Sequence, residues 1–460
     1  MSYESFVASK LALTPATGLR KIPSLSESLF PFQQDLVAWA LRRGRAAIFA
    51  DTGLGKTRMQ LEWARCVPSK RVLILAPLAV AAQTSREGEA MGVPVRVCRG
   101  GLDVQDGVNI TNYDRLHKFD ASMFDAIVLD ESSCIKHHDS KTLAQLLDAF
   151  RDTPWKLCAT ATPSPNDFTE LGTHAEFLGV CTRQEMLAEF FVHDGGDTSK
   201  WRLKGHAKDA FWRWVSSWGA LIRKPSDLGY EDGGYDLPEL RTVQHILPAD
   251  PEAVKAQGLL FAEPAKTLTE RRSARKQSLS ARVKLAAETV IADRQPWIVW
   301  CDLNVESEAL TDAIPGAIEV RGSQDADEKE RKLSLFSSGE IRVIVTKPSI
   351  AGWGLNWQHC ARMAFVGVSD SYEMFYQAVR RIWRFGQSRE CRVHIFASEL
   401  EGSVVANLER KARDAQAMAE ALSVETRAAL REEVYGRPRD VNEYKPGALT
   451  VPEWLRSETC

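Results

Sequence analysis

The segment ADTGLGKT at residues 50–57 carries the strongest chemical signal in the chain. Gly53 and Gly55 allow the backbone to turn sharply, so that its N–H groups can point at phosphate oxygens. A helix that begins near Lys56 would add the positive end of its dipole. Lys56 is long enough to reach the β- and γ-phosphates, and the Thr57 hydroxyl can ligate Mg²⁺. The segment therefore predicts a site for ATP and Mg²⁺.

Two adjacent carboxylates end an apolar run in AIVLDESS, residues 126–133. The run predicts a buried strand, and ligands of open α/β sheets bind where such strands end. Asp130 would hold Mg²⁺, and Glu131 would orient and deprotonate an attacking water. A pair of acids on a solvated strand end is the plain alternative. The phosphate-binding pattern upstream favours the catalytic interpretation.

Two arginines spaced three apart follow much later, in QAVRRIWRFGQ at residues 377–387. This spacing places Arg381 and Arg384 on one face of a helix. Guanidinium groups suit the spread-out charge of a phosphoryl group in transfer, so we expect an arginine-finger arrangement. The alternative is an ordinary basic surface helix that also includes Arg380.

Strands and helices that alternate along the chain must position these residues. Short, nearly continuous apolar runs predict parallel strands that are covered on both faces. Helical stretches separate many of them, as at 58–65 and 143–150, which predicts α/β architecture. The predicted strands are 46–50, 72–77, 95–98, 108–112, 126–130 and 157–160 in the first half, and 297–301, 317–320, 343–346, 363–366 and 393–396 in the second half.

We expect the chain to form two α/β lobes of similar architecture. We expect an N-terminal extension over 1–28, a first lobe over 29–238, a second lobe over 239–430 and an irregular tail over 431–460. The first lobe includes an insert at about 185–235 that is rich in Trp, Gly, Lys and Arg.

Composition sets limits on the class of protein. A hydrophobic fraction of 44% is enough for ordinary buried cores, and a net charge of −2 gives no global reason to bind nucleic acid. The nine cysteines are scattered without a C-x-x-C pair, which argues against a disulfide framework or a zinc site. No apolar run is long enough for a signal peptide or a membrane span. These features predict a cytoplasmic protein that does not interact with membranes.

Further short segments accompany the three motifs in order along the chain: LFPFQQ at 29–34, LAPLAVAAQ at 75–83, ITNYDRL at 110–116, TATPSPNDFTEL at 160–171 and TKPSIAGWGLNW at 346–357. Together they resemble superfamily 2 helicases and, within these, the SWI/SNF-type branch. The chain also resembles compact stand-alone helicases of phage and prophage type, which suggests a bacterial or phage-infected cell as its location. The departures are Ala161 and Arg380, each in place of a usual Gly, and Trp383 in place of a usual His.

The resemblance implies two tandem RecA-like lobes with parallel sheets, and an ATP site in the cleft between them. It implies catalytic roles for Lys56, Asp130, Glu131, Arg381 and Arg384. Thr57 and Asp130 would hold Mg²⁺. Hydroxyls would contact a nucleic-acid backbone at Thr111, Thr160 and Thr346. The ATP contacts would come from Gln33, Thr52, Gly53, Gly55, Lys56, Thr57 and Gly354.

Two further groups of residues have competing interpretations. The segment 269–284 is basic, and Arg271, Arg275 and Arg282 share a helical face that either lines a nucleic-acid path or is solvated. The tryptophans of the insert could stack on bases, but a Trp stripe at helical spacing favours core packing. For His137 and His138, a polar loop is a better interpretation than a metal site, because no third ligand is suitably spaced.

Three functions are compatible with these features. The first is an ATP-driven translocase on DNA, with duplex favoured and RNA not excluded; such a protein is a nucleic-acid-stimulated ATPase. The second is a strand-separating helicase on DNA or RNA, although no wedge hairpin is evident in the sequence. The third is a nucleotide-dependent switch without motor activity. The presence of Glu131, Arg381 and Arg384 argues for hydrolysis and against the switch.

Overall fold

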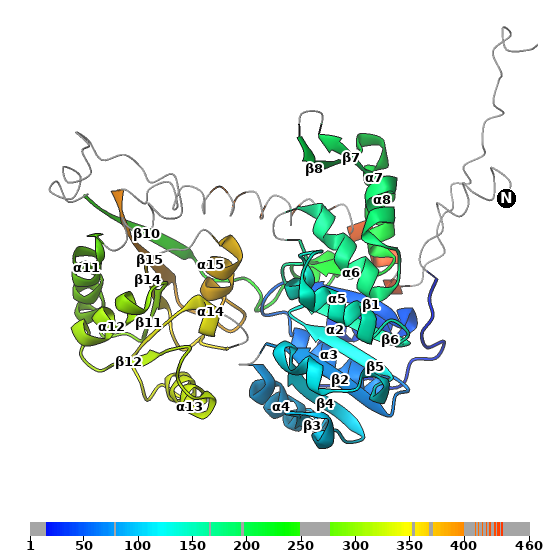
Figure 1. Ribbon diagram of the computed structural model, residues 1–460, viewed down its shortest axis with the longest axis horizontal. Coiled ribbons are helices and arrows are strands. Elements are labelled where there is room, and N and C mark those ends of the chain that lie inside the picture. The colour runs from blue at the N-terminus through cyan, green and yellow to red at the C-terminus, as the bar shows by residue number, and fades with distance from the viewer. Residues whose placement is uncertain are drawn as a thin grey trace, which may run out of the picture.

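The computed structural model describes residues 15–77, 80–164, 167–194, 197–248, 277–351, 355–367 and 371–399, with separate positions between 410 and 435. These residues form two α/β lobes, each built on its own sheet (Figure 1). Lobe 1 lies on the right of Figure 1 and lobe 2 on the left. The predicted fold class, two tandem RecA-like lobes with parallel sheets, is confirmed.

The sheet of lobe 1 has seven strands in the order β3-β4-β2-β5-β6-β1-β9, and each neighbouring pair is parallel. Its central strands are almost entirely buried, as expected for apolar runs that are covered on both faces. Its strands are β1 (Arg45–Ala50), β2 (Arg71–Ala76), β3 (Val95–Val97), β4 (Gly107–Asn112), β5 (Ala126–Asp130), β6 (Trp155–Thr160) and β9 (Gly219–Ile222).

Helices cover both faces of this sheet because successive side chains of each strand point to opposite sides. Ile48 packs into the core beneath one group of helices, and the next residue, Phe49, packs into the core on the other face. The first group is α2 (Pro31–Arg43), α3 (Lys56–Cys66) and α4 (Ala81–Ala90). The second group is α5 (Lys141–Ala149), α6 (Leu171–Leu178), α7 (Arg183–Phe190) and α8 (Lys208–Ser216).

Lobe 2 repeats this plan with six parallel strands in the order β10-β15-β14-β11-β13-β12. Helices α11 (Leu279–Ala292) and α12 (Asn304–Ala313) cover one face. Helices α13 (Ala326–Ser337), α14 (Pro348–Ala351) and α15 (Tyr372–Val379) cover the other. Its strands are β10 (Leu240–Leu247), β11 (Trp297–Cys301), β12 (Ala317–Val320), β13 (Val343–Thr346), β14 (Arg362–Val366) and β15 (Cys391–Ser398).

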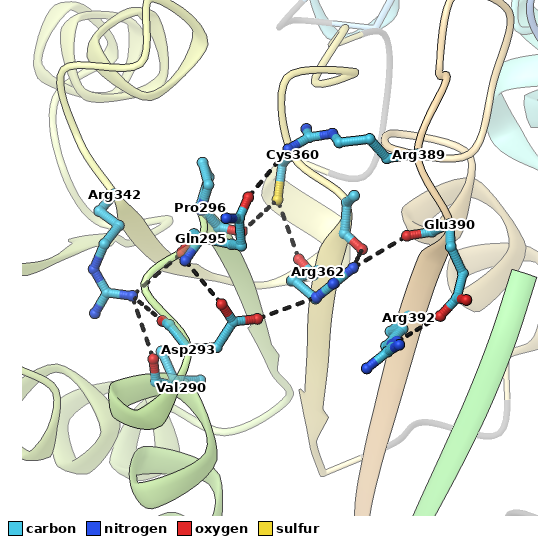
Figure 2. A network of polar contacts seen from close by, with 11 residues as sticks. Val290, Asp293, Gln295, Pro296, Arg342, Cys360, Arg362, Arg389, Glu390 and Arg392 are labelled. Carbon is cyan, nitrogen blue, oxygen red and sulfur yellow. Dashed lines mark hydrogen bonds and ion pairs between the residues drawn. The ribbon is translucent and has the colours of Figure 1, made fainter. Parts of the chain in front are cut away.

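A polar network lies at the amino ends of the strands of lobe 2 (Figure 2). Arg342 donates to the Asp293 carbonyl at 2.9 Å, and Arg362 Nε donates to the Asp293 carboxylate at 3.1 Å. The buried Cys360 thiol bonds to the Pro296 carbonyl at 3.1 Å. These arginines hold the loop before β11 in place, so their role is structural.

The insert of lobe 1 contains a hairpin that the sequence analysis missed. Strands β7 (Phe191–Asp194) and β8 (Asp197–Leu203) pair antiparallel, belong to neither large sheet and project from lobe 1 (Figure 1). In the same insert, Trp212 and Trp218 are buried in the core of lobe 1. The packing interpretation of the Trp stripe is confirmed for these two residues.

The chain returns to lobe 1 after lobe 2. Leu430 and Val434 are buried in the same core as α2, and Arg427 forms an ion pair with Asp227 at 2.8 Å. Arg431 Nη2 donates to the Ser226 carbonyl at 3.0 Å. The prediction that lobe 2 ends at residue 430 did not include this return of the chain to lobe 1. None of the helices in the described part of the chain is long and apolar enough to cross a membrane.

Candidate active site between the lobes

The predicted phosphate-binding loop joins β1 to α3 and requires two glycines. Gly53 and Gly55 have φ angles of +94° and +80°, a region that disfavours other residues. A Cβ atom on Gly55 would lie 2.3 Å from Gln33 Nε2, and one on Gly53 would lie 3.0 Å from Phe385 of lobe 2. The loop is therefore pressed between α2 and the second lobe, and only glycine fits at both positions.

Lys56 begins α3 and lies among acidic groups. Its ammonium donates to the carbonyl of Ala50 at 2.9 Å. Burial lowers the pKa of Lys56, while the charges of Glu131, Asp51 and Asp130 act in the opposite direction. The lysine that the sequence predicted to bind phosphate thus faces both predicted catalytic carboxylates.

Asp130 ends β5 with its carboxylate buried. Gln60 Nε2 donates to Asp130 Oδ1 at 2.6 Å, and the Tyr113 hydroxyl donates to the Asp130 carbonyl at 2.7 Å. Burial and the adjacent charge of Glu131 raise the pKa of Asp130. Bringing a cation to this position would stabilise both carboxylates in their charged form.

Glu131 has an unusual backbone conformation. Its φ of +50° makes it the one residue other than glycine with positive φ in the described chain. Such strain persists where the surrounding structure enforces it, and it is concentrated at functional sites. Thr160 Oγ1, at the end of β6, donates to Glu131 Oε2 at 3.3 Å. Thr160 thus restrains the carboxylate of Glu131, which lines the cavity between the lobes.

Arg381 and Arg384 enter the site from lobe 2. They lie in the turn that follows α15, not on the helix that the spacing predicted, because α15 ends at Val379. Both donate to the Leu355 carbonyl, at 3.1 and 3.4 Å. Burial lowers the pKa of Arg381 to about 9, with a further contribution from the charge of Arg384, and it lowers the pKa of Arg384 to about 10.

Within the described part of the chain, these two guanidinium groups have no ion-pair partner. Neither forms an ion pair with a carboxylate of the described chain, and the buried Nε of Arg384 has no hydrogen-bond partner there. Two buried cations side by side are costly unless an anion neutralises them. A bound triphosphate would supply that anion, so the residues present fit a nucleotide.

A cavity of about 380 Å³ brings these groups together, which is within the size range of small-ligand sites. The predicted residues that line it are Thr52, Gly53, Gly55, Lys56, Thr57, Asp130, Glu131, Arg381 and Arg384. Other residues that line the cavity were not predicted, among them Gln83, Glu87, Asn356, Gln358 and Phe385. Several of these residues lie within or beside the recognised motifs, and that position in the sequence could have indicated that they line the site.

Thr57 and Asp130 would hold Mg²⁺, which neutralises phosphate charge when it is bound. A hydroxyl and a carboxylate are the hard oxygen donors that this ion prefers. No cluster of three or more His, Cys, Asp or Glu residues suited to a metal exists among the described residues.

Gln33 lies behind the loop and not on the cavity surface. Its side chain is buried, accepts from Phe30 N at 2.9 Å and donates to the Leu54 carbonyl at 2.9 Å. Gln33 therefore links α2 to the predicted phosphate-binding loop through hydrogen bonds. Gly354, the predicted ATP contact from lobe 2, lies outside the described residues.

The predicted nucleic-acid contacts are not gathered on one surface. Thr111, Thr160 and Thr346 are all buried, and Thr346 Oγ1 donates to the Val320 carbonyl at 3.0 Å. Their positions therefore give no support to phosphate contacts through these hydroxyls. Arg271 and Arg275 lie outside the described residues.

Arg282, the third arginine of that basic segment, is placed differently from either sequence interpretation. It is fully buried in an ion pair with Glu306 at 2.9 Å, so it neither lines a nucleic-acid path nor lies in solvent.

Comparison with known families adds one finding. Residues 290–386 match the helicase conserved C-terminal domain. The chain carries a helicase C-terminal domain. This domain spans β11 to β14 and α15, and it includes both arginines of the cavity. It indicates a helicase-type protein of superfamily 1 or 2, so the broader part of the predicted resemblance is confirmed. A search of curated proteins gives no match.

Proposed function

We propose that this protein is an ATP-dependent translocase of the SWI/SNF type that moves along double-stranded DNA. The observation that carries the proposal is one cavity lined by residues of both lobes. Lys56 and Glu131 come from lobe 1, and Arg381 and Arg384 come from lobe 2. A site divided in this way is complete only when the lobes are closed.

The chemistry follows from the groups in the cavity. Lys56 and the loop N–H groups bind the β- and γ-phosphates. Glu131 accepts the proton of the attacking water as the γ-phosphoryl group is transferred. Arg381 and Arg384 stabilise the charge that builds up on the transferred group. The products are ADP and inorganic phosphate, and their release removes the anion that held the arginines against lobe 1.

Movement follows from this cycle of closure. ATP favours the closed arrangement and hydrolysis relaxes it, so the distance between the lobes changes once per ATP. Two lobes that hold the same nucleic-acid backbone would then advance stepwise. The resemblance to SWI/SNF-type motors favours duplex DNA as the track, and contacts to its phosphates would carry no sequence information.

The first test is the ATPase rate with duplex DNA, single-stranded DNA, RNA or no polymer. We expect duplex DNA to give the largest stimulation, and a triplex-displacement assay to show the third strand stripped in the presence of ATP. Glu131→Gln should bind ATP but lower turnover at least about 100-fold, because the base is lost. Equal turnover with and without every polymer would contradict a motor and favour a nucleotide switch.

The β7–β8 hairpin favours a second candidate function, strand separation. It stands apart from both sheets, carries the paired rings of His193 and Trp201 with centroids 3.8 Å apart, and presents an exposed Arg202. Aromatic and basic groups on a projecting hairpin suit contact with nucleic-acid bases at a fork. Unwinding of a forked duplex that is lost in Trp201→Ala, with ATPase activity retained, would support this function over duplex translocation.

A further inference from the structure

Asp51, the second residue of the phosphate-binding loop, is bound from lobe 2. The Tyr376 hydroxyl donates to Asp51 Oδ1 at 2.7 Å, and Arg380 Nη2 donates to Asp51 Oδ2 at 3.0 Å. Thr52 N also donates to Oδ1, at 2.6 Å. Two of these three donors therefore cross the cleft between the lobes.

The contact is shielded from water. The side chains of Arg380 and Asp51 are 8% and 16% exposed. Burial alone would raise the pKa of Asp51, but Arg380 and Tyr376 outweigh that effect, so its pKa lies below the ordinary value. Breaking a shielded charge pair leaves an uncompensated charge, which is far more costly than breaking a surface pair.

Aromatic rings hold Arg380 in place. Its guanidinium lies 5.0 Å from the ring centroid of Tyr376 and 4.6 Å from that of Trp383. Trp383 Nε1 in turn donates to the Pro238 carbonyl at 2.7 Å. Arg380 and Trp383 are the two positions at which this motif departs from the family pattern, so the two unusual residues act as one unit.

A second ionic contact from α15 reaches lobe 1. Glu373 forms an ion pair with Lys136, which follows the catalytic Glu131 by five residues. Glu373, Tyr376 and Arg380 are spaced by three and four residues, so they share one side of α15 and the turn after it. This side contacts both the phosphate-binding loop and the segment after the catalytic carboxylates.

We propose that Arg380 is a positioning residue, which pairs with Asp51 to set the closed arrangement in which Arg381 and Arg384 face the nucleotide. Consecutive Cα atoms are about 3.8 Å apart, so anchoring Arg380 on lobe 1 fixes where Arg381 enters the cavity. The pair also neutralises Asp51, whose charge would otherwise repel the phosphates. This inference rests on the proposed ATPase function.

Steady-state ATPase kinetics of the full-length protein test the proposal. Arg380→Ala should lower kcat at least tenfold, because the arginines lose their alignment, and should raise KM for ATP, because Asp51 is left unneutralised. Asp51→Asn should lower kcat to a similar extent without raising KM. The double variant should be no slower than Arg380→Ala alone, since both changes remove the same contact.

Milder variants and a control separate positioning from a general loss of structure. Tyr376→Phe removes only the hydroxyl and should lower kcat severalfold, and Arg380→Lys should restore part of the activity lost in Arg380→Ala. Arg392→Ala changes an exposed arginine in the network of Figure 2 and should leave both constants unchanged. Thermal unfolding of each variant confirms that it folds.

The outcomes are distinguishable. A wild-type protein without ATPase activity would overturn the proposed function itself. An active wild type whose kcat is unchanged by Arg380→Ala would overturn the positioning role alone. Effects of Asp51→Asn and Arg380→Ala that multiply in the double variant would also overturn it, because independent effects exclude a shared contact.

Discussion

Thr160 Oγ1 donates a hydrogen bond to Glu131 Oε2 at 3.3 Å, and this contact joins the ends of two neighbouring strands at the cavity. Asp130 on β5 pairs in register with Ala159 on β6, so the next residue of each segment, Glu131 and Thr160, lies beside the other. Thr160 also accepts from Thr162 N at 3.2 Å, which fixes the orientation of its hydroxyl. The carboxylate that we propose as the general base is thus oriented by the adjacent strand.

Replacing Thr160 with Val should therefore slow catalysis without weakening nucleotide binding. The change keeps the shape of the side chain but frees the Glu131 carboxylate. We expect kcat to fall about tenfold, with KM for ATP nearly unchanged. This loss is smaller than the roughly 10²–10⁴-fold increase in rate that a positioned base contributes, because Glu131 itself is still present. Thr289→Val removes a hydroxyl that bonds only a helix carbonyl far from the site, and it should have no effect on kcat. A loss of ATP binding in Thr160→Val would contradict this role.

Removing either cavity arginine should lower kcat far more than it changes nucleotide affinity. Arginine fingers contribute about 10³–10⁵ to turnover, so Arg381→Ala and Arg384→Ala should each lower kcat by about 10³ or more. Lysine should not substitute well, because a point charge cannot match the guanidinium fork. Arg389→Ala serves as the control, since Arg389 bonds the exposed Gln295 (Figure 2) and the His359 carbonyl. Turnover in Arg384→Ala equal to that of the wild type would rule out its catalytic role.

Stability should fall as the pH drops below about 6.5, in part because of His174. This residue is fully buried, bonds the Ser132 hydroxyl at 3.1 Å, and has its pKa lowered by burial from 6.5 to about 4. The unfolded chain takes up the proton first, so the free energy of unfolding declines between these two pH values and is unaffected by His174 above them. The full shift corresponds to about 3 kcal/mol.

Urea unfolding of wild type and His174→Gln at a series of pH values measures this contribution. The variant keeps a polar partner for Ser132 but cannot titrate, so its stability should vary less steeply between pH 6.5 and 4. Burial also lowers the pKa of His394 to about 4, so some slope should remain. Identical slopes in the two proteins would show that His174 does not titrate as its burial implies.

The buried ion pair of Arg282 and Glu306 should be essential for the stability of lobe 2. Both side chains are fully buried, and Glu306 Oε2 also accepts the backbone N–H groups of Asp302 and Leu303 where α12 begins. Glu306→Ala removes the buried carboxylate that balances the charge of the Arg282 guanidinium, so we expect a loss of about 3–5 kcal/mol in the free energy of unfolding. Glu308→Ala breaks an exposed pair with Arg321 and should cost about 1 kcal/mol or less. Equal losses in the two variants would contradict this assignment.

Much of the fold could be predicted because its parallel strands are short, apolar and buried on both faces. The runs that end at Ala50 and Asp130 are both strands in the structure. Strand β10 was not predicted, because it is an edge strand whose exposed side chains interrupt the apolar pattern. The β7–β8 hairpin was also missed, although the Gly-Gly pair at 195–196 is a recognised turn signal between strands.

The sequence by itself determined the local chemistry of this protein. Gly53, Gly55 and Lys56 predict a phosphate-binding loop because their conformations and reach depend on neighbours a few residues away. Only the tertiary structure decided which distant groups meet, since burial and contact depend on how whole lobes pack. It buried Arg282 against Glu306, and it brought Arg380 across the cleft to Asp51, a contact that no local pattern encodes.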